Sequence, residues 1–409
     1  MIQNELTLAD VENAQELIRD VVRHTPLVGL RPLTERVGGP VRLKCENLQR
    51  AGSFKIRGAY TRLSRLTDHE KSAGVVAASA GNHAQGVALA AQMLGVKATV
   101  FMPEGATLAK VSATRGYGAE VKFFGQTLGD AIEEAQKWCA ETGRPFIHPY
   151  DHLDICAGQG TVGLEILEQY PDVRTVVVCT GGGGLLAGIA TAVKGRRPDV
   201  KVIGVQASGA AAYPASLKAH HPVRLEKMRT MADGIAVPTP GEIPFAIVEN
   251  LVDEIRTVSE DSLSRAILLM LERSKLIVEP AGAAAAAAIL DAPEAFEPPV
   301  VAVLSGGNID PLVLLRVIRH GLAAAERYLS IRLHISDTPG SLANLLTLIG
   351  SHGANVVDLE HLRTHPQLDV EEVEVALQLE TRGPSHKADV LRILEESRYH
   401  VLASHAPEN

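Results

Sequence analysis

The sequence predicts an α/β protein of two or three domains, with parallel sheets covered by helices and a small C-terminal module of different topology. Short apolar runs alternate with helix-length segments over most of the chain, and near Arg327 the pattern changes to two-residue alternation. Aromatic residues make up only 4% of the chain and glycines number 36, which favours layers packed with Ala, Val and Leu. At 409 residues the chain also exceeds what one hydrophobic core usually supports.

The predicted elements begin with an amphipathic helix. Apolar residues recur at helical spacing from Leu8 to Val22, Thr7 and Asp10 resemble a capping box, and His24-Thr25-Pro26-Leu27 ends the helix. Apolar runs then predict the strands Val41 to Glu46, Gly74 to Ser79, Ala98 to Met102, Glu120 to Phe124, Thr175 to Cys179, Val200 to Gln206 and Val300 to Leu304. The run Ala283 to Ala288 predicts a tightly packed helix, because alanine has the highest helix propensity.

The C-terminal module reads as strand, helix, strand, strand, helix and strand. Alternation of apolar residues predicts strands at Leu329 to Ile335, at Asn355 to Arg363 and at Val370 to Leu379, the last two separated by a polar loop at Thr364 to Asp369. Asp337-Thr338-Pro339-Gly340 forms a turn, and the helices are Ser341 to Ser351 and Pro384 to Ser397. This βαββαβ order matches the ferredoxin-like topology.

Composition excludes several classes of protein. The net charge is -8 and the Lys and Arg residues are scattered, so no basic face is available for nucleic acid. Cys45, Cys139, Cys156 and Cys179 have no CxxC spacing and are interpreted as reduced packing residues. Because there is neither a signal-peptide pattern at the N-terminus nor an apolar segment of membrane-spanning length, we expect a cytoplasmic protein.

The first chemical motif is Glu46-Asn47-Leu48-Gln49-Arg50-Ala51-Gly52-Ser53-Phe54-Lys55-Ile56-Arg57-Gly58-Ala59, with a lysine in a glycine- and serine-flanked loop before a helix. A lysine in apolar surroundings has a lowered pKa and can form a Schiff base. Taken alone, Lys55 would be interpreted as an ordinary solvated surface lysine, so the other motifs must carry the prediction of a Schiff base.

The second motif, Cys179-Thr180-Gly181-Gly182-Gly183-Gly184-Leu185, lies directly between a strand and a helix. Four consecutive glycines free the backbone N–H groups to bind one anion, which predicts a phosphate site, whereas a simple flexible turn needs fewer glycines. Walker A is excluded, because no Gly-Lys-Ser/Thr follows. NAD is the second candidate cofactor, but the next strand ends in Gln206 where a ribose-binding acid is required.

Two further strand-to-helix turns complete the set of motifs. In Ala78-Ser79-Ala80-Gly81-Asn82-His83 the helix N-terminus can bind a substrate carboxylate and Asn82 can bind a ring hydroxyl, while His83 is either a base or a structural hydrogen-bond partner. In Ser305-Gly306-Gly307-Asn308 the polar residues could instead cap the next helix at Asp310.

The four motifs, with His24-Thr25-Pro26-Leu27, resemble in residues and order the fold-type II pyridoxal-phosphate enzymes, which have a tryptophan synthase β-like fold, and among them the threonine and serine dehydratases. The resemblance implies two parallel-sheet α/β domains, in a catalytic domain at 1–325 with a smaller α/β subdomain inserted at about 50–150. It also implies pyridoxal 5'-phosphate as cofactor. It assigns residues to the cofactor, namely Phe54, Lys55, Asn82, Gly181, Gly182, Gly183, Gly184, Leu185 and Ser305. It assigns to the substrate carboxylate Ser79, Ala80, Gly81, Asn82 and His83.

By the same resemblance, Lys55 forms the Schiff base with the cofactor and then acts as the acid and base. The substrate amine displaces Lys55, the freed amine removes the α-proton, the β-hydroxyl leaves, and the released enamine loses ammonia to give a 2-oxo acid. A neutral Ser305 at the pyridine nitrogen favours β-elimination over transamination.

This chain differs from the family pattern at two places, and these differences limit the activities and ligands that the resemblance implies. Serine racemases have a second serine where this chain has Ala80, so racemisation is disfavoured. These relatives also bind a divalent metal through carboxylates after the strand that ends here near Gln206, whereas the run Ala207 to Ala212 has no acid. We therefore expect no structural metal.

The tail, residues 326–409, resembles an ACT domain in its βαββαβ order and its Asp337-Thr338-Pro339-Gly340-Ser341-Leu342 turn. The resemblance implies an amino-acid effector, with isoleucine expected, at Asp337, Pro339, Gly340 and Leu342. A pure oligomerisation module is the alternative.

The expected activity is deamination of L-threonine to 2-oxobutanoate by a homotetramer in isoleucine biosynthesis, with L-serine as a second substrate. The alternatives are an L-serine dehydratase, a catabolic threonine dehydratase, and an amino-acid sensor without catalysis, against which the intact motifs argue.

Overall fold

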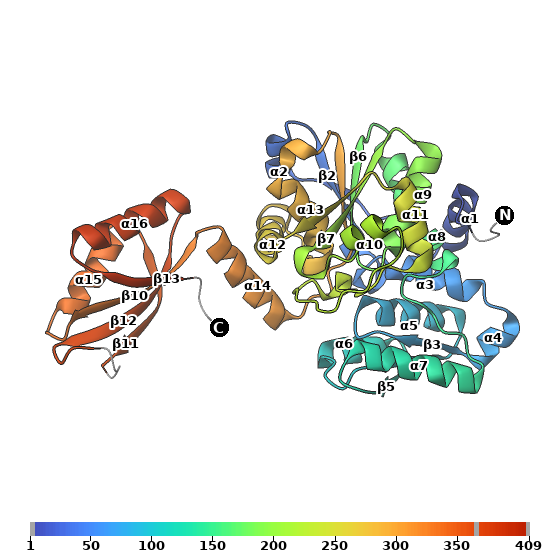
Figure 1. The fold of residues 1–409 in the computed structure, drawn as a ribbon, viewed down its shortest axis with the longest axis horizontal. Coiled ribbons are helices and arrows are strands. Elements are labelled where there is room, and N and C mark those ends of the chain that lie inside the picture. The colour runs from blue at the N-terminus through green and yellow to red at the C-terminus, as the bar shows by residue number, and fades with distance from the viewer. Residues whose placement is uncertain (1–4, 364–367, 406–409) are drawn as a thin grey trace. The chain divides into compact units, whose positions relative to one another are not determined.

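The computed structural model of the protein describes residues 5–363 and 368–405, so most of the predicted loop Thr364 to Asp369 lies outside the described residues. The chain divides into two compact units, one up to Asp310 and one from Pro311 (Figure 1). The first unit contains two sheets, which are parallel except for one edge strand, and the second unit contains one antiparallel sheet. This arrangement confirms the predicted fold class.

The larger sheet of the first unit has the strand order β1-β2-β9-β6-β7-β8. Neighbouring strands from β2 to β8 run parallel, and β1 pairs with β2 antiparallel. The strands are β1 (Leu27–Gly29), β2 (Val41–Cys45), β6 (Thr175–Cys179), β7 (Lys201–Ala207), β8 (Glu254–Val258) and β9 (Val300–Leu304). The helices of this part are α1 (Leu8–Ile18), α2 (Arg31–Val37), α8 (Leu153–Gln169), α9 (Gly184–Arg196), α10 (Tyr213–Ala219), α11 (Glu242–Leu251), α12 (Glu260–Ser274) and α13 (Pro280–Asp291).

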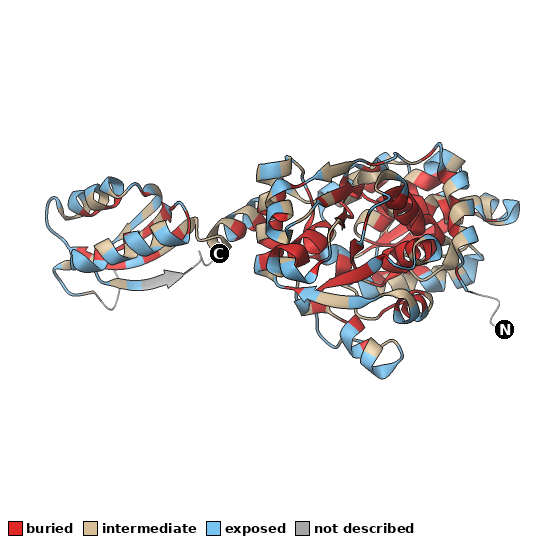
Figure 2. Ribbon diagram, turned by 90° about the horizontal axis from the view of Figure 1, so that it is seen from above, coloured by how far each residue is buried: buried red, intermediate tan, exposed pale blue. Residues whose placement is uncertain are grey.

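The smaller sheet is parallel and has the order β3-β4-β5. Its strands are β3 (Val75–Ala78), β4 (Ala98–Met102) and β5 (Glu120–Phe123). The helices around it are α3 (Lys55–Ser64), α4 (Asp68–Ala73), α5 (Asn82–Leu94), α6 (Leu108–Gly116) and α7 (Leu128–Thr142). Ile56, Ile147 and Ile155 join the core of this sheet to neighbouring segments, and the buried residues in Figure 2 gather on the strands and on helix faces packed against them.

The seven strands predicted for this unit all form, each within one residue of its expected bounds. The capping box of Thr7 and Asp10 is present at the start of α1. The sequence pattern did not predict β1 or β8. β1 is only three residues long, and β8 is a partly exposed edge strand without a continuous apolar run.

The predicted alanine helix is α13, in which all residues from Pro280 to Leu290 are buried. Small side chains let its first turn approach the loop after β9, since a Cβ on Gly282 would lie 2.5 Å from the carbonyl oxygen of Gly306. The helix therefore carries its preceding residue, Glu279, to the loop that contains Ser305.

The second unit begins with α14 (Pro311–Ala324) and continues as a βαββαβ module. Its sheet has the order β11-β12-β10-β13, with all neighbours antiparallel. The elements are β10 (Tyr328–Ser336), α15 (Ser341–Ser351), β11 (Asn355–Leu362), β12 (Glu372–Glu380), α16 (Pro384–Glu396) and β13 (Val401–His405). Both helices pack on one face of the sheet through Leu345 and Leu394, while Val370, predicted in a strand, is fully exposed before β12.

Candidate active site

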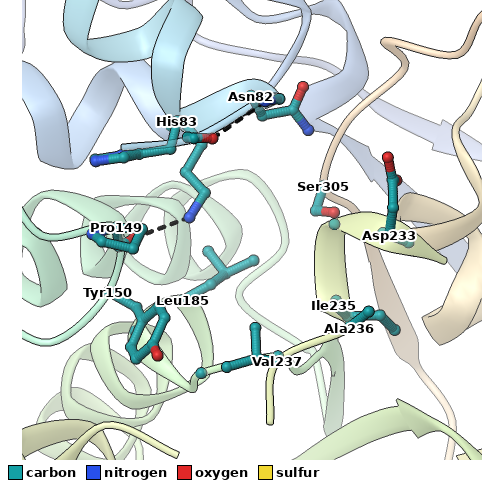
Figure 3. Close-up of a pocket in the computed structure, with 18 of the residues that line it drawn as sticks. Asn82, His83, Pro149, Tyr150, Leu185, Asp233, Ile235, Ala236, Val237 and Ser305 are labelled. Atoms are coloured by element: carbon teal, nitrogen blue, oxygen red, sulfur yellow. Dashed lines mark hydrogen bonds between the residues drawn. The ribbon is translucent and has the colours of Figure 1, made fainter. Parts of the chain in front are cut away.

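A cavity of about 380 Å³ lies where the parallel strands of the first unit end. Ser79 follows β3, Gly181 follows β6 and Ser305 follows β9, and all three residues line this cavity. Ligands of parallel α/β proteins bind at the carboxyl ends of the strands. Every residue predicted for the cofactor and the substrate lines the same cavity, part of which Figure 3 shows.

Lys55 is the first residue of α3, and its amine is in the cavity. Its Nζ donates a hydrogen bond of 2.9 Å to the carbonyl oxygen of Pro149 and lies 5.1 Å from the centroid of the Phe54 ring. Burial lowers the pKa of Lys55 to about 8, although the nearby Cys179 and Glu279 act in the opposite direction. An amine with this pKa is partly unprotonated near neutral pH and can act as a nucleophile or a base.

The position of α3 is fixed by Arg57, two residues after Lys55. The guanidinium is fully buried, donates two hydrogen bonds of 2.8 Å to Glu46, and donates one of 2.6 Å to Glu165. Glu165 also pairs with the buried Lys44. The charges are therefore satisfied inside the protein, and this part of the lysine motif has a structural role.

The glycine loop forms another wall of the cavity. A Cβ on Gly182 would lie 2.4 Å from Tyr150 Cδ2, and a Cβ on Gly183 would lie 1.9 Å from Tyr213 Oη. Gly183 also has a φ of +101°, which side-chain-bearing residues rarely adopt. No side chain caps α9, so the N–H groups of its first turn are available to an anion in the cavity.

Gln206 supports the glycine loop from inside the protein. Its Nε2 donates to the carbonyl oxygen of Thr180 at 3.2 Å, and its Oε1 accepts from the backbone N–H of Tyr213 at 2.9 Å. The residue is fully buried. Because the end of β7 is occupied in this way, a ribose has no binding residue there and the dinucleotide alternative loses its support.

The loop after β3 provides the opposite wall. Ser79 Oγ accepts a hydrogen bond of 3.1 Å from the backbone N–H of Gly81, and no side chain caps α5. The first-turn N–H groups of this helix can therefore bind a carboxylate. Ala80 also lines the cavity, and its side chain carries no hydroxyl.

His83 has its ring nitrogen occupied by the backbone. Its Nε2 lies 2.8 Å from the carbonyl oxygen of Ile147, which can only accept, so Nε2 carries the hydrogen. Burial, with the positive Lys55 nearby, lowers the pKa of His83 to about 3. This hydrogen bond gives His83 a structural contact, which agrees with one of the two interpretations that the sequence left open.

Ser305 and Asn308 follow β9. Ser305 Oγ accepts a hydrogen bond of 3.1 Å from the thiol of Cys179. Burial raises the pKa of this thiol to about 11. Asn308 donates to the carbonyl oxygen of Ala51 at 2.7 Å and to Asn82 Oδ1 at 2.9 Å. The side chain of Asn308 therefore connects two loops of the site.

Sequence reasoning missed several residues of the cavity wall. Glu279 is buried there and accepts a hydrogen bond of 2.7 Å from Asn82 Nδ2. Lys110 and Asp233 form an ion pair of 2.6 Å that joins α6 to the loop before Ile235. The only local signal for Glu279 was an acid directly before a helix that begins with Pro280; nothing local pointed to the ion pair.

The predicted effector turn lies in the second unit, between β10 and α15. Arg363 donates to both carboxylate oxygens of Asp337 at 3.1 Å, and Gly340 has a φ of +92°. Leu342 is partly buried against the core of this unit, and Pro339 is exposed.

Among the described residues, no cluster of three or more His, Cys, Asp or Glu could hold a metal ion. Across 5–363 and 368–405, no helix has the length and apolar character needed to cross a membrane.

A family model described as pyridoxal-phosphate dependent enzyme matches residues 18–306. The chain belongs to this family. The match includes Lys55, Asn82, Gly181 to Gly184 and Ser305, all of which line the cavity. Pyridoxal phosphate is therefore the cofactor of this protein.

Similar proteins agree with this assignment. The L-threonine ammonia-lyase of Thermotoga maritima is 43% identical over 396 residues, which are 97% of this chain and 99% of that protein. The catabolic L-threonine dehydratase TdcB of Staphylococcus aureus is 43% identical over 326 residues, 78% of this chain and 94% of its own. The structure of the processed form of threonine deaminase isoform 2 from Solanum lycopersicum superposes with a TM-score of 0.74 at 38% identity, covering 76% of this chain and 92% of that one.

The cavity fits the cofactor of a pyridoxal-phosphate enzyme. The backbone of Gly182 and Gly183 borders it, and any Cβ there would collide with Tyr150 or Tyr213. A lysine amine, an amide and a hydroxyl converge on the same space from Lys55, Asn82 and Ser305. A phosphate, an aldehyde carbon and a polar ring therefore each have a chemically suitable partner.

Proposed function

We propose that the protein is an L-threonine ammonia-lyase, which converts L-threonine to 2-oxobutanoate and ammonia. The observation that carries this proposal is the Lys55 amine, held with a pKa of about 8 in the cavity that the glycine loop borders. Relatives with this activity match the chain almost from end to end. Elimination removes one water, and hydrolysis of the released enamine takes one water back.

The residues that would hold the cofactor come from four loops. Lys55 would anchor it covalently beside Phe54, Gly181 to Leu185 would bind the phosphate, and Asn82 and Ser305 would contact the ring. Pyridoxal phosphate, when bound, supplies an electron sink for the pair left behind as the substrate loses its α-proton.

The protein side of the mechanism depends on proton transfer by Lys55. Its unprotonated amine accepts the α-proton of the substrate, and the resulting ammonium can donate a proton in a later step. The N–H groups from Ser79 to His83 bind the substrate carboxylate and so orient the α-carbon. His83 stays neutral and holds this loop against the backbone of Ile147.

Apolar side chains of Leu128, Ile132 and Phe146 line the cavity. They provide a surface for the β-methyl group of threonine, which serine lacks. We therefore propose threonine as the preferred substrate and serine as a slower one that yields pyruvate. A dedicated serine dehydratase would show the opposite preference.

We propose that residues 326–409, which form the larger part of the second unit, are an ACT-like regulatory module. The full-length match to the Thermotoga maritima protein includes this region, whereas the catabolic Staphylococcus aureus relative matches a shorter part of the chain. Isoleucine is the proposed effector, bound at Asp337, Pro339, Gly340 and Leu342, in keeping with a role in isoleucine biosynthesis. A homotetramer in the cytoplasm is the proposed state.

Steady-state formation of 2-oxo acid from L-threonine and L-serine tests the proposal, with and without L-isoleucine. Lys55→Ala should abolish turnover together with the visible absorbance of the bound cofactor. Lys137→Ala, which removes an exposed lysine on α7, should behave as the wild type.

Undiminished turnover in Lys55→Ala would contradict the mechanism. Faster turnover of serine would replace the proposed substrate but keep the chemistry, and turnover insensitive to isoleucine would contradict only the effector. A soluble protein without the cofactor band would instead indicate a sensor.

A further inference from the structure

Glu279 is a buried carboxyl in the wall of the active site that the proposed mechanism does not use. The residue is only 5% exposed, lies directly before α13, and lines the cavity beside Asn82 and Ser305. Its Oε1 accepts a hydrogen bond of 2.7 Å from Asn82 Nδ2. A buried carboxyl is costly unless hydrogen bonds or charges satisfy it, so its position at this site requires an explanation.

The direction of the hydrogen bonds around Asn82 follows from a backbone group. The carbonyl oxygen of Ala51 can only accept, so Asn308 Nδ2, 2.7 Å away, donates to it. The same Nδ2 lies 2.9 Å from Asn82 and donates to its Oδ1. Asn82 Nδ2 is therefore on the side of Glu279, where one of its two hydrogens is used.

This arrangement leaves the second Nδ2 hydrogen of Asn82 for an acceptor in the cavity. Asn82 can make that bond reproducibly only while its amide plane is held at both ends. Asn308 holds the oxygen end and Glu279 holds the nitrogen end. Removal of the Glu279 carboxyl would leave the donor end without a fixed partner.

We propose that Glu279 is a positioning residue of the cofactor site, whose carboxylate orients the Asn82 amide toward a polar group of the bound cofactor. The inference rests on the proposed use of pyridoxal phosphate by this cavity. It extends the site by a residue that lies 197 positions from Asn82 in the sequence.

Glu279 has no role in capping the helix that it precedes. Its side chain makes no cap hydrogen bond to α13. Its backbone N–H donates to Gly306 at 3.1 Å and its carbonyl oxygen accepts from Ala283 at 3.0 Å, and both contacts are independent of the side chain. A substitution of the side chain therefore tests the carboxyl itself.

The charge of Glu279 depends on groups from several elements around it. Burial and the negative Asp233 raise the pKa of Glu279 to about 7, while the Asn82 hydrogen bond, Lys110 and Lys55 act in the opposite direction. The buried thiol of Cys179 also faces this carboxyl. The ionised carboxylate is the stronger acceptor, so the hydrogen bond from Asn82 to Glu279 becomes stronger as the pH rises through this value.

The test is the dissociation constant of pyridoxal phosphate from the full-length apo-protein, measured by fluorescence titration at about pH 6 and about pH 8, on either side of this pKa. The variants are Glu279→Ala and the isosteric Glu279→Gln. The matched control is Asp291→Asn at the other end of α13, where Asp291 pairs with Arg265 at 2.8 Å on the surface.

At about pH 8, Glu279→Ala should raise the dissociation constant about tenfold, because Asn82 loses a fixed acceptor. Glu279→Gln should raise it about threefold at this pH and leave it near the wild-type value at about pH 6, where both side chains are neutral. Asp291→Asn should match the wild type at both pH values. If Glu279 had a purely structural role, the ratio of the dissociation constant of Glu279→Gln to that of the wild type would be the same at both pH values.

Wild-type affinity in Glu279→Ala, or a ratio between Glu279→Gln and the wild type that does not change with pH, would overturn the inference. If Glu279→Ala does not fold, the ratio of dissociation constants between Glu279→Gln and the wild type still tests the inference. Failure of the wild type to bind pyridoxal phosphate would overturn the proposed function as well, so the two failures are distinguishable.

Discussion

The substitution Gly183→Ala tests whether the glycine loop is shaped by the groups packed behind it. Gly183 has a φ of +101°, and a Cβ there would lie 1.9 Å from Tyr213 Oη and 2.9 Å from Pro244 Cβ. Tyr213 is fully buried and cannot move away freely. Alanine should therefore distort the loop as well as strain its backbone.

The size of the effect has two parts. The left-handed conformation costs a side-chain-bearing residue about 1 to 2 kcal/mol. Overpacking against Tyr213 and Pro244 adds about 1 to 3 kcal/mol. We expect Gly183→Ala to lower the free energy of unfolding by about 2 to 5 kcal/mol, and to weaken cofactor binding about tenfold, because a displaced loop amide loses a charge-assisted hydrogen bond.

Urea unfolding of the apo-protein and titration with pyridoxal phosphate measure these two effects. Gly143→Ala is the matched control, since Gly143 also has a positive φ, +66°, but no atom lies within 4 Å of its added Cβ. It should lose only the backbone contribution and keep its cofactor affinity. Combining Gly183→Ala with Tyr213→Phe should recover part of the loss, because the nearest colliding atom is removed.

The reasoning would be refuted if Gly183→Ala and Gly143→Ala were equally stable and bound the cofactor equally well. A loss of affinity that Tyr213→Phe does not reduce would instead locate the collision at Pro244 Cβ or at the ring carbon Cζ of residue 213, both 2.9 Å from the added Cβ.

Three further predictions concern other buried groups. Arg57→Ala should lower the free energy of unfolding by about 3 to 5 kcal/mol in urea, because Glu46 and Glu165 would remain buried without this partner, and an effect below about 1 kcal/mol would argue against it. Burial raises the pKa of the Cys45 and Cys156 thiols to about 12, so at about pH 8 a thiol reagent should label them at least about a hundredfold more slowly in the folded protein than in urea, and equal rates would contradict their burial. The pKa of Glu279 is raised from 4.5 to about 7 in the folded protein. Between these two pH values the folded state keeps a proton that the unfolded state has released, so the free energy of unfolding of the wild type falls as the pH rises. Relative to the wild type, apo Glu279→Gln should therefore gain up to about 3 kcal/mol across this range, and parallel stability curves would exclude this titration.

The sequence alone determined the motifs of this protein and most of its strands. Continuous apolar runs identified the buried parallel strands, because a strand covered on both faces needs apolar residues at every position. Gly181 to Gly184 and Lys55 were recognisable because their chemistry is carried by a short local segment. The alternation from Leu329 onward likewise predicted the βαββαβ order of the second unit.

Other features were decided only by the tertiary structure. Tyr150 and Tyr213 fill the space behind the glycine loop. Glu279, which directly precedes a helix near the end of the first unit, accepts a hydrogen bond from Asn82. No local pattern marks such residues, since their role depends on which surfaces the fold brings together. His83 shows the same limit, because its sequence context allowed a base, and the buried carbonyl oxygen of Ile147 gave it a structural partner instead. Side-chain chemistry can be read from the sequence, but burial and the identity of the partner set the pKa and the direction of each hydrogen bond, and both arise only when distant segments pack together.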